Sequence, residues 1–303
     1  MLFFTFCKVN PPDLRLRRWH LAVLAVQTCL AVGSYYALVC LAPYGSRYLQ
    51  NPLVAQSVML CFLMPTATAA PIIAGKLGGS IQNLTTFILL DNFSTAVVVP
   101  FFFPLVHPLE GMTFAMAVWL IVRKVGPLLV LPFMSAWLLR VAWDRYPRHK
   151  REGKTFSLSP QVAQIPFFLW VCTIVILMAQ VVYSFVCQPV DGVVLVYICI
   201  GAVAGCLLQF FLGRQIGFLL PAGSHGKDYQ DVPVNPAAVP TTKRGISRLT
   251  AGQAFGQKNT TLAIWMAQTY LLPLSAVGPA VYMIVQNVFI SFQLRQAAGC
   301  KRE

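Results

Sequence analysis

Long runs of apolar residues, separated by short polar connections, extend along almost the whole chain. A helix that spans the hydrocarbon core of a bilayer needs about 20 mostly apolar residues. Runs of this length predict spanning helices at roughly 20–42, 53–74, 81–105, 122–143, 161–186, 191–213, 248–272 and 276–296. The stretch 111–143 would be about 50 Å long as one helix, so we expect an interfacial segment at 109–121 before the spanning helix. The pattern therefore predicts an all-α integral membrane protein with about eight transmembrane helices.

The composition agrees with a chain surrounded by lipid. Of 303 residues, 57% are hydrophobic and 11% are charged, whereas soluble domains carry roughly 25% charged residues. We treat residues 1–303 as a single membrane domain. The nine cysteines lie mostly within apolar runs and include no CxxC pair, so the sequence indicates neither a disulfide framework nor a zinc site.

The basic residues are distributed very unevenly between the two sides of the predicted membrane. Nineteen of the 23 lysines and arginines fall in one set of alternate connections, three in the other set, and one inside a helix. Cytoplasmic loops carry the excess of positive charge. We therefore expect the connections 8–18, 144–158 and 214–247 to be cytoplasmic in a multi-pass protein of the cell membrane. This placement accounts for the net charge of +14 and argues against a nucleic-acid partner.

The second predicted helix contains two prolines near the middle of the membrane. Pro65 and Pro71 bracket the small and polar residues of 66–70, which include Thr66 and Thr68. Proline removes backbone donors, and the freed carbonyls are tolerated at that depth only when protein or a water-filled cavity surrounds them. Two interpretations stay open: a kink that packs through small residues, or a broken helix that lines a substrate site.

The seventh predicted helix carries a polar, glycine-punctuated patch inside an apolar span. Its candidate binding residues are Gln253, Gln257, Lys258, Asn259 and Thr260. Lys258 lies ten residues after Arg248, which places it about 15 Å into the membrane. An ionisable residue at that depth is a functional candidate; the alternative is a lysine that extends its charge to the surface.

Asp91 in the third predicted helix is the natural partner for Lys258, and Asn92 adds a further polar group beside it. An unpaired charge at the centre of a spanning helix costs roughly 2.5–3.5 kcal/mol. A Pro-interrupted helix in one half and a polar, interrupted helix in the other are typical of transporters with inverted repeats. We therefore predict two crossing broken helices, with 65–71 facing 256–260, because small residues in both segments permit close approach.

Three segments resemble the bile acid:sodium symporter family. PTATAAPIIAGKLGG resembles the P-x-G-T-A-S-N stretch of that family's broken helix, and FGQKNTTLAIWMA resembles its E-x-G-x-Q-N-S-G-L-A crossing motif. SAVGPAVYMIVQNVFISFQL resembles the last helix of the family. The likeness extends from about Lys8 to Arg295. Because the family has ten helices, it implies that this chain lacks the first helix and most of the second.

The departures from the family pattern concern the sodium ligands. Ala254 stands at the position of the family's carboxylate, and Lys258 stands where a glutamine is expected, while Gly256 and Asn259 are retained. A lysine ammonium brings one positive charge, so we hypothesise that Lys258 replaces a bound sodium and is balanced by Asp91 or by helix-end carbonyls. Sodium coupling, which the resemblance implies, and transport without sodium both stay open, and no other cofactor is expected.

The resemblance implies a secondary transporter that moves a small organic anion across the bilayer by alternating access. The alternatives are a carrier of the same fold that is coupled to protons or to no ion, and a truncated, non-transporting remnant. We do not expect an enzyme, because the sequence contains no HExxH, no GxSxG and no paired acidic motif.

Overall fold

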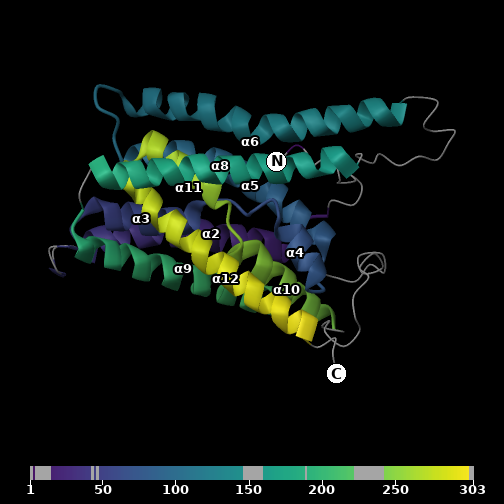
Figure 1. Ribbon diagram of the computed structural model, residues 1–303. Helices are drawn as coiled ribbons and strands as arrows, with labels where there is room; N and C mark the ends of the chain where they lie inside the picture. The colour runs from purple at the N-terminus through teal and green to yellow at the C-terminus, as the bar shows by residue number, and fades with distance from the viewer. Residues whose placement is uncertain are drawn as a thin grey trace. The chain divides into compact units, whose positions relative to one another are not determined.

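The structure is a computed structural model that describes residues 3, 15–41, 44–45, 48–145, 160–187, 190–221 and 242–299. The described residues are mostly helical, with one isolated antiparallel bridge and no longer strand among them. The helices, labelled in Figure 1, are α2 (Arg18–Leu41), α3 (Pro52–Leu63), α4 (Ala70–Lys76), α5 (Ile81–Val106), α6 (Phe114–Arg145), α8 (Pro160–Cys187), α9 (Gly192–Leu219), α10 (Lys243–Gly256), α11 (Thr260–Tyr270), the short 3₁₀ helix η3 (Pro273–Ala276) and α12 (Val277–Gly299).

Long apolar helices confirm the predicted membrane character of the chain. Within the described part of the chain, five stretches are long and apolar enough to cross a bilayer: Arg18–Leu41, Ile81–Val106, Phe114–Leu139, Gly192–Leu219 and Pro273–Ala297. The predicted helices at 53–74 and 248–272 are each interrupted, the first between α3 and α4 and the second between α10 and α11. The inverted repeat itself stays a prediction.

The predicted interfacial segment at 109–121 is wrong in its boundaries. The described backbone is helical from Phe114 onward and continues without a break through Arg123 and Lys124 as α6. No glycine or proline lies between 114 and 125, so nothing in the sequence interrupts the backbone hydrogen bonds there. At about 1.5 Å per residue, α6 exceeds the thickness of the hydrocarbon core.

The predicted loop 214–247 is shorter than expected. Helix α9 continues to Leu219, and α10 already begins at Lys243. The side chain of Thr242 fixes that start, because it accepts a hydrogen bond from the backbone nitrogen of Gly245 at 3.2 Å. Residues 222–241, like most of the predicted cytoplasmic connections 8–18 and 144–158, lie outside the described part of the chain.

The described residues form two compact units. One comprises Met1–Leu14 with Asn92–Ile176, and the other comprises Arg15–Asp91 with Leu177–Glu303, so α5 and α8 each contribute to both units. The first unit contains α6. The second contains α2, α3, α4 and α9 to α12, and it holds most of the predicted site.

Helices α9 and α10 pack with unusually close backbones in the second unit. A Cβ atom on Gly213 would lie 2.5 Å from the carbonyl oxygen of Ala251, and one on Gly217 would lie 2.3 Å from that of Ser247. Pairs of small residues four positions apart permit this approach between membrane helices. The C-terminal end of α9 is therefore fixed along the N-terminal end of α10.

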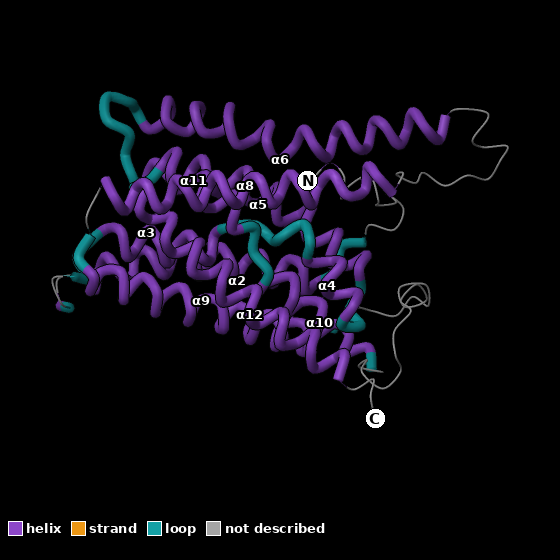
Figure 2. Tube along the Cα trace, in the orientation of Figure 1, coloured by secondary structure: helices purple, strands orange, loops and turns teal. Residues whose placement is uncertain are grey.

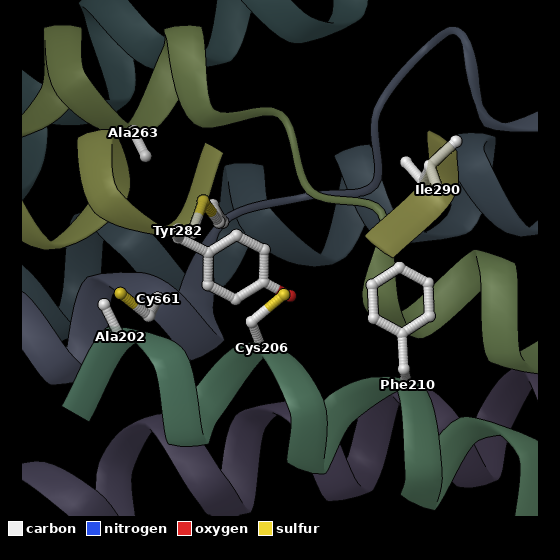
Figure 3. Close-up of a cluster of buried hydrophobic side chains, with 8 residues drawn as sticks. Cys61, Ala202, Cys206, Phe210, Ala263, Tyr282 and Ile290 are labelled. Atoms are coloured by element: carbon white, nitrogen blue, oxygen red, sulfur yellow. The ribbon is translucent and has the colours of Figure 1, made fainter. Parts of the chain in front are cut away.

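A buried cluster lies beside the interruptions and joins four elements of this unit. Figure 3 shows Tyr282 of α12 and Cys206 of α9 at its centre, with the tyrosine hydroxyl directed toward the cysteine sulfur. The Tyr282 hydroxyl donates a hydrogen bond to the carbonyl oxygen of Gly256 at 2.9 Å. This bond satisfies one of the carbonyls freed at the end of α10. The core thereby supports the interrupted backbone.

Candidate functional site

The interruptions of the two broken helices lie against each other, and they appear in Figure 2 as loop segments between helices. The backbone nitrogen of Ala67 donates to the carbonyl oxygen of Gln257 at 2.9 Å, and that of Asn259 donates to Pro65 at 2.7 Å. These bonds form the antiparallel bridge between Thr66 and Lys258. The predicted contact between 65–71 and 256–260 is confirmed. We call this place the crossing.

Local sequence explains where each helix stops. Met64 is extended, with φ −61° and ψ 141°, because the following Pro65 disfavours the helical region for the residue before it. On the other side, the side chain of Asn259 caps α11 by accepting a hydrogen bond from the backbone nitrogen of Leu262 at 3.2 Å. Two helices end at the crossing in this way, and two others begin there.

Asp91 of α5 contributes a fully buried carboxylate to the crossing. One oxygen, Oδ2, accepts hydrogen bonds from the backbone nitrogen and the hydroxyl of Thr66, at 2.7 and 2.8 Å. The other, Oδ1, accepts one from the side-chain amide of Gln27 at 2.8 Å. Asp91 therefore anchors the break of the first crossing helix to α5 and α2.

Lys258 contributes a buried ammonium that is 1% exposed. Its Nζ atom donates to Oε1 of Gln27 at 2.6 Å and lies 4.9 Å from the centroid of the Phe255 ring. Its backbone nitrogen donates to Oε1 of Gln286 at 2.7 Å. The alternative in which the lysine extends its charge to the membrane surface does not agree with this burial.

Asp91, the predicted partner of Lys258, does not accept a hydrogen bond from its ammonium. Gln27 of α2 accepts from Lys258 and donates to Asp91, so it lies between the two charges; no ion pair among the described residues joins them directly. The amide of Gln27 occupies the place between the two charged groups, since it bonds to Oδ1 of Asp91 on one side and to Nζ of Lys258 on the other. A primary amide offers both an acceptor and a donor, so Gln27 links the two charged groups.

The remaining predicted residues have different roles. Gln257 donates to Gln253, and Gln253 donates to Gln293 at 2.7 Å, which forms a ladder of buried amides along α10 toward α12. Thr260 is buried at the start of α11. Thr68 is half-buried and makes no side-chain hydrogen bond to the described residues.

Asn92 is buried but belongs to the first unit. The crossing thus brings together Thr66, Asp91 and Lys258, whereas Thr68 takes no part in its hydrogen bonds.

Sequence reasoning missed three glutamines: Gln27, Gln286 and Gln293. Each is buried and accepts a hydrogen bond from the crossing or from the amide ladder. The available signal was a single amide within an apolar run, as in LAVLAVQTCLAV around Gln27. Such a residue must find a partner inside the protein, because lipid offers none.

The charges of the crossing balance each other. Helices α3 and α10 end there with partial negative charge, and α4 and α11 begin there with partial positive charge, so the helix ends offset one another. The ammonium of Lys258 balances the carboxylate of Asp91. No group of three His, Cys, Asp or Glu side chains suited to a metal ion occurs among the described residues. An inorganic cation could bind at Asp91 only if the Lys258 ammonium moved away, or if the cation replaced hydrogen bonds that Thr66 and Gln27 donate to the carboxylate.

No protein-family model matches the chain, and no curated protein matches it. The role of the crossing is therefore inferred from its own geometry and charges.

Proposed function

We propose that the chain is a secondary transporter of the cell membrane that moves a small organic anion by alternating access. The crossing is the observation that carries this proposal. Two interrupted helices within a membrane protein meet through backbone hydrogen bonds and enclose an acidic and a basic side chain. Irregular backbone and buried charges at membrane depth are costly and are typical of substrate and ion sites in transporters.

The resemblance to bile acid:sodium symporters supports the same class and implies an organic anion as the substrate. The residues of the crossing do not favour sodium as the coupling ion. All three donors to Asp91 are in place, and the positive charge that a sodium ion would supply is supplied by Lys258. This observation favours the variant of the proposal in which the carrier is coupled to protons or to no ion.

Uptake by the purified protein in liposomes tests the proposal. Mixtures of labelled organic anions are offered with a sodium gradient, with a pH gradient, and with neither. We expect uptake that is saturable and does not require sodium. Strict dependence on sodium, with unchanged sodium affinity in Lys258→Gln, would reject the role given to Lys258. Absence of uptake under every gradient would instead support a non-transporting remnant.

A further inference from the structure

A half-buried arginine without an acceptor lies at the end of α9. The side chain of Arg214 runs against α10, because a Cβ atom on Gly252 would lie 2.6 Å from its Cγ. Its guanidinium lies 5.8 Å from the centroid of the Phe289 ring of α12. It makes no hydrogen bond or ion pair with any residue that the structure describes. A guanidinium has five N–H donors, and partly removing them from water without an acceptor is unfavourable.

The amide ladder ends at Gln293 of α12, four residues after the Phe289 ring that lies beneath this arginine. The side-chain nitrogen of Gln293 is a donor that the ladder does not use. Gln257 donates to Gln253, and Gln253 donates to Oε1 of Gln293. The Nε2 atom of Gln293 is buried and has no partner among the described residues, although the side chain is only 8% exposed. A buried amide donor without a partner costs about 1–3 kcal/mol.

The side chains of Arg214 and Gln293 contact neighbouring residues of α10 and α12. Arg214 contacts Gly252, and Gln293 bonds to the next residue of α10, Gln253. On α12, the ring beneath the guanidinium belongs to Phe289, which lies one turn before Gln293 and on the same face. The two sets of unsatisfied donors therefore lie over the same stretch of α10 and α12.

The other charged residues described on α10 and α12 toward this end are all basic. They are Lys243, Arg244 and Arg248 on α10 and Arg295 on α12. The two acidic residues that the structure describes in this unit lie elsewhere: Asp91 is bonded at the crossing, and Asp191 caps the opposite end of α9. No described carboxylate of this unit is available to Arg214.

We propose that Arg214 and the Nε2 donor of Gln293 form a binding subsite for an oxyanion, a carboxylate or phosphate group, on the cytoplasmic side of the crossing. Arginine binds both groups through two parallel N–H bonds. The subsite rests on the proposed function for its role, which is to hold the anionic group of the substrate between the cytoplasm and the crossing. The ladder from Gln293 to Gln257 connects the two places. A phospholipid headgroup presents the same chemistry as a free anion.

Anion binding by the purified protein tests the subsite without requiring transport. Thermal stability in a neutral detergent is measured against inorganic phosphate and against succinate, with chloride keeping the ionic strength constant. A second arm uses nanodiscs with and without phosphatidylglycerol. We expect a saturable stabilisation in wild type, and the arm in which it appears identifies a soluble anion or a lipid headgroup as the ligand.

Arg214→Gln should weaken this binding roughly tenfold or more, since a hydrogen bond to a charged group contributes about 1.5–3 kcal/mol. Gln293→Leu should weaken it several-fold. Arg244→Gln is the matched control, because the Arg244 guanidinium also lies over a ring, 5.7 Å from the centroid of Phe218, but is exposed and away from the ladder. If Arg214→Gln does not fold, Arg214→Lys keeps the charge and removes the planar pair of donors, and it should still weaken binding.

Equal effects of Arg214→Gln and Arg244→Gln would overturn the subsite, because they would indicate diffuse attraction to positive charge. Absence of saturable binding in both arms would also overturn it. The outcome is separable from that of the proposed function. Binding that depends on Arg214 in a protein that moves no anion rejects the transporter alone, and uptake with an unchanged KM in Arg214→Gln rejects the subsite alone.

Discussion

At the residue scale, the crossing depends on a neutral side chain as much as on its two charged ones. Gln27 joins the ammonium of Lys258 to the carboxylate of Asp91. All three residues are buried, and the most exposed of them, Gln27, is 4% exposed. The sequence identified Lys258 and Asp91, because ionisable residues inside apolar runs are rare. It did not identify Gln27, because the choice among single amides in several helices depends on how those helices pack.

Lys258→Met and Asp91→Asn should each strongly destabilise the protein. Removing one member of a buried charge pair costs about 3–5 kcal/mol in soluble proteins, since the other charge is left uncompensated. Thermal unfolding in detergent measures the effect, with the exposed Lys243→Met as the control. The double variant should be less destabilised than the sum of the two. A strictly additive double variant would show that the two charges are not linked.

Gln27→Leu should reduce that non-additivity. The leucine occupies a similar volume but offers neither the acceptor to Lys258 nor the donor to Asp91. Coupling energies between residues in one network are typically 0.5–3 kcal/mol. A double-mutant cycle of Lys258→Met and Asp91→Asn in the Gln27→Leu background should give a smaller coupling energy than in wild type, and the direct attraction between the two charges should account for what remains. Persistence of the full coupling would mean that the charges interact without the amide.

At the scale of elements, the prolines and polar residues in the sequence predicted the two interruptions, but not the way in which they are satisfied. Met64 and Pro65 end α3 through local backbone preference, which a sequence pattern reveals. The hydrogen bonds from Ala67 to Gln257 and from Asn259 to Pro65 join segments far apart in the chain. The pairing followed from the rule that freed backbone groups need partners, whereas its register could be known only from the structure.

Gly213→Ala on α9 should destabilise the contact with α10, whereas Gly205→Ala should be tolerated. A Cβ atom at Gly213 would meet a backbone carbonyl oxygen at 2.5 Å, while one at Gly205 would meet the Phe62 ring at 3.4 Å. Overpacking against rigid backbone costs about 1–3 kcal/mol, and alanine in a helix interior otherwise gains about 1 kcal/mol over glycine. Comparison of the two unfolding temperatures measures the difference. Equal unfolding temperatures would show that α9 and α10 can move apart enough to accommodate the added methyl group.

At the scale of the whole molecule, the orientation in the membrane is a prediction from charge. Nineteen basic residues lie in the predicted cytoplasmic connections and three in the opposite ones. In the second unit, two of these connections meet: the backbone nitrogen of Ser80 donates to the hydroxyl of Thr250 at 2.9 Å, and Gly217 approaches Ser247. The sequence revealed the membrane-spanning character of the long apolar runs, while the number of spans and the sides of their connections stay predictions. It did not reveal that α6 continues through Arg123, since two basic residues near its start suggested a boundary.

Single cysteines placed at Ser157 and Ser224 in a cysteine-free variant should be inaccessible to a membrane-impermeant maleimide added outside intact cells. A cysteine at Gly111, in an opposite connection, should react. Labelling after permeabilisation provides the control for reactivity. Reaction of Ser157→Cys and Ser224→Cys from outside would reverse the orientation, and with it the assignment of the Arg214 subsite to the cytoplasmic side.

The backbone bonds of the crossing also have a consequence for how the protein is made. Ala67 and its backbone partner Gln257 are 190 residues apart in the chain (257 − 67). At about 5–20 residues per second, synthesis of that interval takes roughly 10–40 s. During this time the carbonyl of Pro65 and the backbone nitrogen of Ala67, at the break of the first helix, lack the partners that satisfy them in the finished structure. The first break can therefore reach its final hydrogen bonding only after the second half of the chain has been made.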